Sequence, residues 1–540
     1  MSDKQPIYIL PENVERTMGK DAQRNNILAA KLVSEAVKTT LGPKGMDKML
    51  VDSMGDITVT NDGVTILEEM QIEHPIAKMM VEIARTQDKE VGDGTTTAVM
   101  IAGRLLENAE KLLDQKIHPT VITKGYRLAA EKSQELLKNL AINIEDNDNL
   151  LKELVFTSLA SKNASAKKEK FADIIVKAVK QISESKNEQN SKFKIDLSNI
   201  KIEKVKGEGI EDTELIQGIV LDKEKVSVDM PSQIRNAKIA LIDVALEIKT
   251  PETETKISIS SPEQLQSFLE QEEKSLKDMA DKIKKSGATV VFCQKGIDEV
   301  AQYYLAKEKI YACRRIPKSD MEKLARATSA KIVSNLNELN ETQLGNAELV
   351  EGKKEDSDSY TYITGCKNPK ALTILIRGGT EHVISEIERA LKDGMGVVAS
   401  VLKDKKIVPG AGAIEVELAK RLRDYSKSLN GREQFAVEEF ANAMEFIPIT
   451  LAENAGLDPI DILTELRARH QQGETNAGIN LLTGKIEDSI VAGIIEPIRI
   501  KTQAIDSATE VAVMILRIDD VIAANTKPSR GQMPPGMGEY

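Results

Sequence analysis

The sequence contains no tryptophan and few aromatic residues of any kind. Aromatic residues make up 3% of the 540 positions, which argues against the stacking platforms that bind single-stranded nucleic acid. The net charge of −11 at pH 7 points the same way, because the phosphate backbone attracts basic surfaces. We therefore expect no nucleic-acid partner.

Cysteine and histidine are also scarce, and their spacing predicts no metal site of their own. Cys293, Cys313 and Cys366 are odd in number and far apart, and no CxxC pair occurs. This pattern argues against a disulfide framework and a zinc knuckle, and it favours a reducing, cytoplasmic location. The four histidines show no HxxxH spacing, so we expect surface or capping roles for them.

Long apolar runs and a P-loop are missing as well. No stretch is apolar for long enough to span a membrane, and the N-terminus has no signal-peptide core. Each Gly-Lys pair is followed by the wrong residue for GxxxxGK[ST], which excludes that class of nucleotide site. We expect no membrane partner. The length of 540 residues predicts two or three domains.

The most informative motif that is present is GDGTTT at residues 92–97. Apolar residues at spacings of three and four follow it, which predicts that the motif lies at a helix start. The first N–H groups of a helix have no partner within the helix and attract anions. Glycine lets a phosphate approach, threonine hydroxyls donate to it, and Asp93 is a hard ligand suited to Mg²⁺. Taken alone, the hexapeptide fits an ordinary capped helix equally well.

The segments before this motif predict a helix and then a hairpin. Residues 21–40 form an amphipathic helix pattern that ends at Leu41-Gly42-Pro43. Residues 57–60 and 64–67 alternate like strands around Asn61-Asp62-Gly63, which predicts a hairpin with Asp62 at its tip. Helical patterns then continue to about residue 140.

The middle of the chain predicts a sheet domain with its own core. Residues 288–333 alternate as βαβαβ, the pattern of a parallel sheet. Before it, the polar stretch 249–260 precedes Ser261-Pro262-Glu263, which predicts the cap of a helix. That helix would project from the sheet domain, with an apolar stripe comprising Leu265, Leu269, Leu276, Met279 and Ile283. A long surface loop with a packed helix is the alternative.

The last third of the chain is predicted to be mostly helical. Breaks are expected at Pro448, at residues 456–459 and within residues 473–484. The tail at residues 527–540 has nothing to pack, so we expect it to be disordered. The order of helical, sheet and again helical patterns suggests a domain inserted into a discontinuous helical one.

Six segments in register carry a resemblance to a known family. They are TTLGPKGMDKML (39–50), TVTNDGVTIL (58–67), VGDGTTTAVMIAG (91–103), VPGAGAIEVELA (408–419), AENAGLDPIDIL (452–463) and IEPIRIKTQAIDSATEVAVMILRIDDVI (495–522). Their order and spacing resemble those of the group II chaperonins, the family that includes the archaeal thermosome subunits. The resemblance extends from about residue 8 to residue 525.

The resemblance implies an α+β multidomain fold in three tiers. A helical equatorial domain that binds ATP would comprise residues 1–145 and 404–540. A discontinuous intermediate hinge domain would comprise residues 146–212 and 367–403. An inserted α/β apical domain at residues 213–366 would bind substrate and carry a helical protrusion, the built-in lid, at about residues 247–283.

The resemblance also implies an activity and its partners. The chain would be an ATPase and a molecular chaperone subunit of a double-ring chaperonin that encloses and folds non-native proteins. Its cofactors would be ATP and Mg²⁺. Its partners would be identical or homologous subunits in stacked rings, together with unfolded client proteins. One alternative is a weakly hydrolysing regulatory or scaffold subunit of a mixed ring. A small-molecule enzyme built on the sheet at residues 288–335 is another, although no catalytic constellation is found there.

The family's site residues can be carried over by position. Asp62 would orient the attacking water and Asp393 would be the second catalytic acid, so that hydrolysis depends on domain closure. Asp93 would hold Mg²⁺. The remaining nucleotide-binding positions would be Leu41, Gly42, Pro43, Gly94, Thr95, Thr96, Thr97, Lys162, Ala411, Gly412, Asn480 and Glu496. Without the resemblance, the residues favour simpler roles, with Asp62 a turn residue, Asp393 a helix-surface acid and Lys162 a solvated lysine.

Three positions depart from the family pattern. Ala411 interrupts a run of glycines, and its methyl group could crowd the nucleotide if its φ is positive. Gly394 follows Asp393 where alanine is usual, at a cost on the order of 1 kcal/mol within a helix. Asn480 stands where an acid is frequent. These departures bear on nucleotide affinity and rate, since no catalytic carboxylate is lost.

Overall fold

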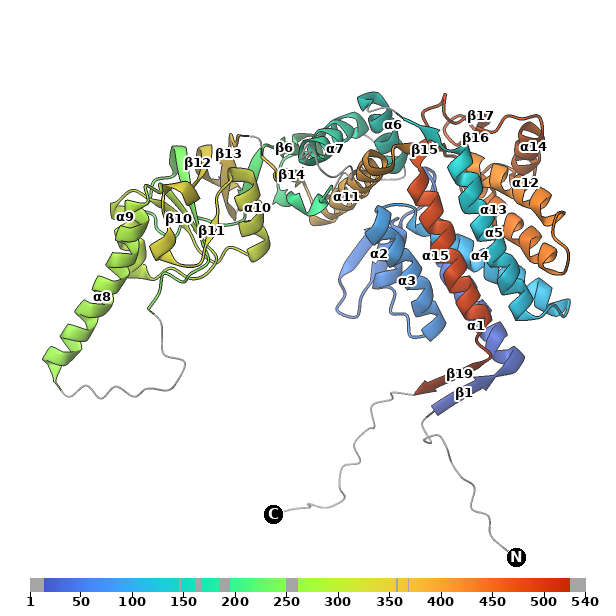
Figure 1. The fold of residues 1–540 in the computed structure, drawn as a ribbon, viewed down its shortest axis with the longest axis horizontal. Helices are drawn as coiled ribbons and strands as arrows, with labels where there is room; N and C mark the ends of the chain where they lie inside the picture. Colours follow the sequence, from blue (N-terminus) through green and yellow to red (C-terminus); the bar gives the residue numbers. More distant parts are fainter. Residues whose placement is uncertain are drawn as a thin grey trace, which may run out of the picture. The chain divides into compact units, whose positions relative to one another are not determined.

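The computed structural model describes residues 14–144, 147–160, 167–183, 195–248, 261–355, 358–367 and 369–524. Helices and sheets are mixed along the chain, as the sequence predicts. The chain separates into two compact units (Figure 1). The first unit is built from both ends of the chain, Met1–Ile142 and Ile407–Tyr540, and the second is Asn143–Lys406. The division into three tiers stays a prediction.

The first unit is a bundle of amphipathic helices around one core. Its helices are α1 (Gly19–Lys38), α2 (Gly63–Glu69), α3 (Pro75–Val91), α4 (Thr95–Asp114), α5 (Pro119–Leu140), α12 (Ala413–Ser426), α13 (Glu433–Asn454), α14 (Pro459–Gln471) and α15 (Ile498–Leu516). Helix α4 is buried over most of its length because α1, α3, α13 and α15 all pack against it. The first and last parts of the sequence therefore share this core (Figure 1).

Short antiparallel strand pairs accompany the helices of this bundle. These pairs are β1 (Val14–Met18) with β19 (Asp520–Ala524), β2 (Lys48–Val51) with β3 (Ile57–Thr60), β15 (Lys406–Pro409) with β18 (Ile495–Pro497), and β16 (Ala477–Asn480) with β17 (Lys485–Asp488). The first pair joins the two ends of the described chain, with Val14 opposite Ala524.

The predicted hairpin around Asp62 is wrong. Strand β3 pairs with the preceding β2, and residues 64–67 belong to helix α2. The Asp62 side chain accepts a hydrogen bond from the backbone N–H of Thr65 and so caps this helix. Val64, Ile66 and Leu67 are buried in the helical core. Asp before Gly fits a turn and a helix cap alike, and tertiary packing of this short helix decides between them.

The predicted break at Pro448 is also wrong. Helix α13 continues through Pro448 to Asn454. Proline removes one backbone donor from a helix, but α13 is buried against α4, α5 and α12, and this packing holds the helix together. The other two predicted breaks are confirmed, because Asp458 caps α14 with Pro459 at its first position and residues 473–484 contain no helix.

The second unit combines helices with two sheets. Its helices are α6 (Asp148–Leu159), α7 (Lys168–Ser183), α8 (Pro262–Lys285), α9 (Glu299–Lys307), α10 (Lys318–Thr328) and α11 (Glu381–Asp404). The larger sheet has the order β10-β9-β8-β12-β13-β7, with β11 also paired to β8, and the smaller one has the order β5-β14-β6. The strands are β5 (Ile200–Lys206), β6 (Glu214–Ile216), β7 (Gly218–Leu221), β8 (Gln233–Ile242), β9 (Val290–Cys293), β10 (Tyr311–Cys313), β11 (Ile332–Val333), β12 (Gly345–Glu355), β13 (Asp358–Thr364) and β14 (Leu372–Gly378).

The predicted βαβαβ alternation is confirmed within the larger sheet. Strands β8, β9, β10 and β11 pair in parallel, with α9 and α10 as the crossover helices. The sheet is mixed rather than wholly parallel, because β12 joins β8 antiparallel and β13 and β7 continue in that sense. Strand β12 has an irregular hydrophobic pattern, which the sequence analysis did not recognise.

Helix α8 extends from the larger sheet, as predicted (Figure 1). The Ser261 hydroxyl caps it by accepting from the N–H of Gln264 at 3.3 Å. The predicted apolar stripe divides into two halves. Leu276 and Ile283 are buried against the sheet domain, whereas Leu265 and Leu269 are 46% and 55% exposed. The polar stretch 249–260 and the tail 527–540 lie outside the described residues.

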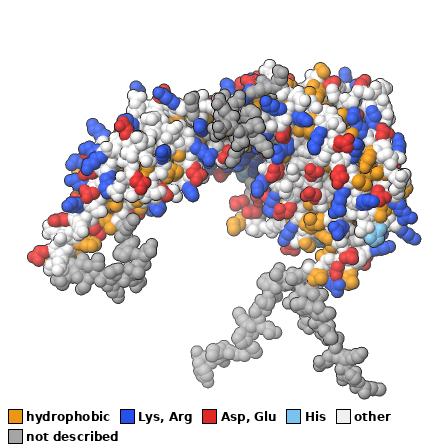
Figure 2. All heavy atoms as spheres, viewed as in Figure 1, with side chains coloured by type: hydrophobic (Ala, Val, Ile, Leu, Met, Phe, Trp, Pro, Cys, Tyr) orange, Lys and Arg blue, Asp and Glu red, His pale blue; other side chains and the backbone are white. Residues whose placement is uncertain are grey.

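The described surface mixes charges of both signs, as Figure 2 shows for one face. Among the helices described, none has the length and hydrophobicity needed to cross a bilayer.

Candidate functional site

The GDGTTT motif forms the loop between α3 and α4, as predicted. Gly92 and Gly94 both have φ near 80°, a left-handed conformation that suits glycine. A Cβ atom on Gly94 would lie 2.6 Å from Cγ2 of Ile500, so the position also has no room for a side chain. The buried Gln87 amide fixes the loop by donating to the carbonyl oxygens of Asp93 at 2.9 Å and Ile500 at 3.2 Å.

The start of α4 has backbone N–H groups that can bind an anion. Gly94 is the N-cap residue, and no side chain caps this helix start. The first N–H groups of a helix and the positive end of its dipole attract phosphate oxygens. Asp93 lies one residue before the cap, and its Oδ1 accepts from the N–H of Gly94 at 2.6 Å. The motif therefore offers donors from the helix and one carboxylate beside them.

Asp62 lies at a second helix start, and that start lies directly against the first. Its Oδ2 accepts from the backbone N–H of Thr65 at 3.0 Å and from the Thr65 hydroxyl at 2.7 Å. A Cβ atom on the next residue, Gly63, would be only 2.6 Å from Oγ1 of Thr96 and 3.1 Å from Oγ1 of Thr95. Only a glycine lets α2 and α4 begin so close together. The two predicted segments are therefore neighbours.

The Leu41-Gly42-Pro43 loop is fixed to the end of α13. The side-chain amide of Asn454 donates to the carbonyl oxygens of Lys38 and Leu41 at 3.0 and 2.9 Å. Gly42 has φ of 81°, and a Cβ there would lie 2.5 Å from Leu451 and 3.4 Å from Leu481. The loop therefore lies close to the residue that follows Asn480.

The loop at residues 410–412 leads into α12, which like α4 begins without a side-chain cap. Gly412 is the N-cap of α12, with φ of 78° and no side-chain cap. Ala411 has a positive φ of 58°, the conformation in which its methyl group is expected to crowd the nucleotide. The Ala411 carbonyl accepts from the N–H of Ile479 at 3.0 Å. A Cβ on Gly412 would lie 2.7 Å from Cβ of Pro448, which places α13 directly behind the loop.

Asn480 stabilises the turn between β16 and β17. Its Oδ1 accepts from the N–H of Leu482 at 3.0 Å, and its Nδ2 donates to Oε2 of Glu487 at 3.1 Å. These contacts give the residue a structural role. A contact with the base or ribose stays a prediction.

Glu496 belongs to a buried ionic cluster that the sequence analysis missed. The Lys501 ammonium lies 2.8 Å from Oε1 of Glu415 and 2.6 Å from Oε2 of Glu496. Burial lowers the pKa of Lys501, but the two carboxylates outweigh it and the net effect raises that pKa. Burial raises the pKa of Glu496, and although Lys501 opposes this, Glu415 and Asp93 add to it, so the net shift is upward.

Through these ion pairs the cluster joins α12, β18 and α15. The Lys501 ammonium is the counter-charge of both carboxylates, and the charge of Asp93 contributes to the raised pKa of Glu496. A sequence signal for it exists, because Glu415 and Lys501 interrupt the buried faces of α12 and α15. A charged residue on a buried face needs a partner of opposite sign.

Two predicted site residues do not belong to the first unit. Asp393 is half-buried on α11 of the second unit, and Lys162 lies outside the described residues. Gly394 has a packing role, because a Cβ there would lie 2.6 Å from Cδ1 of the buried Ile175. Its presence is explained by helix packing between α11 and α7.

The residues of the first unit fit a magnesium nucleotide. Helices α4 and α12 begin without a side-chain cap, so their first N–H groups can donate to a ligand. Asp93, next to the start of α4, provides an oxygen ligand. Mg²⁺ usually takes one or two carboxylates together with substrate phosphates and water. Among the described residues, no group of three or more His, Cys, Asp or Glu could hold a metal by itself.

Comparison with known proteins gives the same family along almost the whole chain. A profile of the TCP-1/cpn60 chaperonin family matches residues 33–526. A thermosome subunit of Methanopyrus kandleri is 57% identical over 523 residues, which cover 97% of this chain and 95% of the relative. The thermosome subunit beta of Archaeoglobus fulgidus is 58% identical over 521 residues, covering 96% of this chain and 95% of the relative. A thermosome subunit of Pyrococcus horikoshii is 56% identical over 539 residues, covering 99% and 98%.

Proposed function

Because the chain belongs to the TCP-1/cpn60 chaperonin family, we propose that it is an ATP-dependent subunit of a double-ring chaperonin that encloses and folds non-native proteins. The names of its relatives support the chaperonin role. Archaeoglobus fulgidus has relatives named alpha and beta, which supports an assembly of identical or homologous subunits. Unfolded proteins are the proposed clients.

The observation that carries the nucleotide site is the close approach of the α2 and α4 helix starts at Gly63. This approach brings the Asp62 loop beside the open end of α4, where the N–H groups and hydroxyls of Thr95, Thr96 and Thr97 would hold phosphates. Asp93 would hold Mg²⁺, which when bound supplies positive charge against the phosphates. Leu41–Pro43, Ala411, Gly412, Asn480 and Glu496 would surround the rest of the nucleotide.

Asp62 is proposed to orient the attacking water and to accept its proton. Thr65 holds one carboxylate oxygen through two hydrogen bonds, which fixes the orientation of the group. A base fixed in this way loses little entropy when the reaction begins. Asp393 as the second catalytic acid and Lys162 as a γ-phosphate contact rest on the family resemblance.

The alternative of a weakly hydrolysing or scaffold subunit is not favoured. It depended on Ala411, Gly394 and Asn480. Gly394 has a packing reason and Asn480 caps a turn, and neither replaces a catalytic group. We therefore propose a hydrolysing subunit.

The test is magnesium-dependent ATP turnover by the assembled protein carrying Asp62→Ala and Asp393→Ala. We expect turnover to fall by about 10²-fold or more, because a positioned acid–base group contributes about 10²–10⁴-fold. Unchanged turnover in this double variant would refute the assignment of both residues.

Asp458→Ala is the matched control for this test. Asp458 caps α14 as Asp62 caps α2, accepting from the N–H groups of Ile460 and Asp461. Its loss should cost about 1 kcal/mol of helix stability without changing turnover by more than about twofold. An equal fall in both proteins would mean that Asp62 acts only as a helix cap.

A further inference from the structure

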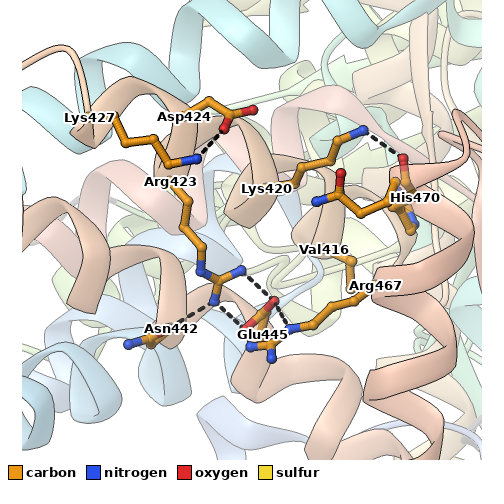
Figure 3. Close-up of a pocket in the computed structure, with 10 residues that line it drawn as sticks. Val416, Lys420, Arg423, Asp424, Lys427, Asn442, Glu445, Arg467 and His470 are labelled. Carbon is orange, nitrogen blue, oxygen red and sulfur yellow. Dashed lines mark hydrogen bonds and ion pairs between the residues drawn. The ribbon is translucent and has the colours of Figure 1, made fainter.

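A concave site lies in the first unit, between α12, α13 and α14 (Figure 3). We call it the three-helix pocket. It has a volume of about 310 Å³, near the lower end of the range of about 300–1,000 Å³ for ligand pockets. Its charged lining comprises Lys420, Arg423, Asp424, Lys427, Glu445 and Arg467. None of these residues belongs to the predicted nucleotide site.

The floor of the three-helix pocket is a carboxylate held by two arginines. The side chain of Glu445 is 3% exposed. Its Oε1 accepts from Nη1 of Arg423 at 2.7 Å and from Nε of Arg467 at 2.8 Å. Its Oε2 accepts from Nη2 of each arginine. Both guanidinium groups are therefore bidentate, and Glu445 fixes their planes (Figure 3).

The two arginines keep donors for a further partner. A guanidinium has five N–H donors, and Glu445 takes two from each. Asn442 accepts one more from Arg423 at 2.9 Å. Among the described residues, Glu445 and Asn442 are the acceptors that these two guanidinium groups contact. The Arg467 side chain is 49% exposed, so its remaining donors are accessible.

Lysines complete a positive lining. Lys420 donates to the carbonyl oxygen of His470 at 2.6 Å, which holds its ammonium at the pocket wall. Lys427 lies 3.0 Å from Asp424. Four cationic side chains thus line the pocket against two carboxylates, which gives a net charge of +2, with histidine taken as neutral, in a chain whose net charge is −11.

The wall behind Lys420 is rigid. His470 is fully buried, with Nδ1 2.9 Å from Oε2 of Glu417 and Nε2 2.9 Å from the carbonyl oxygen of Ala477. Arg421 pairs with Glu417 at 2.7 Å, and the Lys420 ammonium lies 4.0 Å from the same carboxylate. Hydrogen bonds therefore hold Lys420, Arg423 and Arg467 in place before any ligand arrives.

We propose that the three-helix pocket binds a phosphate group, either inorganic phosphate or a phosphate monoester. A phosphate monoester carries about −1.5 to −2 charges at pH 7, which matches the net charge of the lining. Arginine forks and lysine ammonium groups are the side chains that recognise phosphate oxygens. An apolar ligand would not match this lining, because it would bury charged donors without partners.

The test is equilibrium dialysis of radiolabelled inorganic phosphate against the assembled full-length protein without nucleotide. We expect binding with Kd of about 1 mM or tighter. Arg467→Gln should weaken it about tenfold or more through the loss of charge-assisted hydrogen bonds. Arg469→Gln is the matched control, because Arg469 lies two residues away on the same helix and pairs with Glu465 outside the pocket. It should change Kd by less than about twofold.

A second variant keeps the test decisive if Arg467→Gln fails to fold. Lys420→Gln with Lys427→Gln leaves both arginines on Glu445 and should also weaken phosphate binding. The proposal is overturned if the protein takes up no phosphate, or if both sets of pocket variants bind it as the control does. In a competition arm, displacement by phenyl phosphate below the inorganic phosphate concentration supports a monoester ligand. Displacement only at higher concentration supports free phosphate.

Discussion

Ala411 has a backbone conformation that residues other than glycine rarely adopt. Its φ of 58° lies in the left-handed region, which costs a residue with a Cβ roughly 1–2 kcal/mol. Its carbonyl is tied to Ile479, so the loop cannot relax alone. The strain lies within the proposed nucleotide loop, next to the glycine that caps α12.

Replacing Ala411 with glycine should therefore stabilise the protein. Relief of the left-handed strain exceeds the entropic cost of glycine, about 0.5–1 kcal/mol, so we expect a gain of up to about 1 kcal/mol, read as a higher thermal unfolding midpoint. Ala419→Gly, in the middle of α12, is the control and should lower the midpoint, because a helical alanine is lost. A lower midpoint for both variants would show that Ala411 is not strained.

At the same scale, the chemistry of individual residues is easier to predict from the sequence than the secondary structure around them. The chemistry and spacing of residues 92–97 predict Asp93 and the threonines, and the family resemblance implies Asp62. The structure places Gly63, the residue after Asp62, against Thr95 and Thr96. The setting of Asp62 was wrong, since it caps a helix instead of turning a hairpin. Lys501 and Glu415 were missed because a buried ion pair joins residues far apart in the sequence.

At the scale of elements, Glu445 joins three helices through charge. It lies on α13 and receives Arg423 from α12 and Arg467 from α14. Burial raises its pKa, but hydrogen bonds from Arg467 and Arg423 outweigh burial and hold the pKa of Glu445 below the usual value of 4.5. A carboxylate with a depressed pKa stabilises the fold above its unfolded pKa, and this stability is lost as the pH falls through the folded pKa.

Glu445→Gln should accordingly destabilise the protein in a pH-dependent way. At pH 7 we expect a loss of about 2 kcal/mol, because two partly exposed arginines lose their counter-charge and a hydrogen bond to a charged group contributes about 1.5–3 kcal/mol. The difference from the unchanged protein should begin to shrink below the usual pKa of 4.5. Unfolding midpoints between pH 7 and pH 3 measure this.

Glu465→Gln provides the comparison for this pH series. Glu465 is exposed and pairs with Arg469 on the same helix, so its loss should cost less than about 0.5 kcal/mol at any pH. A difference for Glu445→Gln that stays constant down to pH 3 would contradict the ionic role of Glu445.

The predicted elements fail where tertiary contacts decide the outcome. Helix α13 passes through Pro448 because packing on several sides outweighs one lost hydrogen bond. Strands β12 and β13 extend the sheet antiparallel, although their sequences alternate poorly. By contrast, α4 begins at GDGTTT and α8 begins after Ser261 as predicted, since a glycine-rich helix start, a Ser-Pro cap and the apolar spacing after them are local signals.

At the scale of the whole molecule, the exposed half of α8 bears on the enclosure of clients. Leu265, Phe268 and Leu269 are 46%, 39% and 55% exposed, whereas Leu276 is buried in the sheet domain. Deletion of residues 250–271 would thus remove the exposed half of the predicted lid and spare the domain core.

We expect this deletion to leave ATP turnover within about twofold of the full chain while abolishing protection of a bound client from protease. The reason is that the removed residues contain no predicted nucleotide contact. The Asp62→Ala, Asp393→Ala protein with its lid intact is the comparison, and it should lack turnover. A client that stays protected after the deletion would refute the lid.

The organisation of the chain into an inserted unit and a discontinuous one was inferred from the order of patterns, and the structure divides the chain between residues 142 and 143 and between 406 and 407. The sequence could suggest an insertion because helical segments flank a βαβαβ pattern. It could not reveal which helices share a core, since α4 meets α13 and α15 only after the chain returns.

The pairing of β1 with β19 has a consequence for how the protein is made on the ribosome. Helices α1 to α5 emerge first, but α12, α13 and α15 and the final strand follow only after the 264 residues from Asn143 to Lys406. At about 5–20 residues per second, synthesis of that interval takes roughly 13–53 s. The apolar faces of the first helices remain uncovered during this time. The nascent chain should therefore need protection from aggregation until its last strand is released.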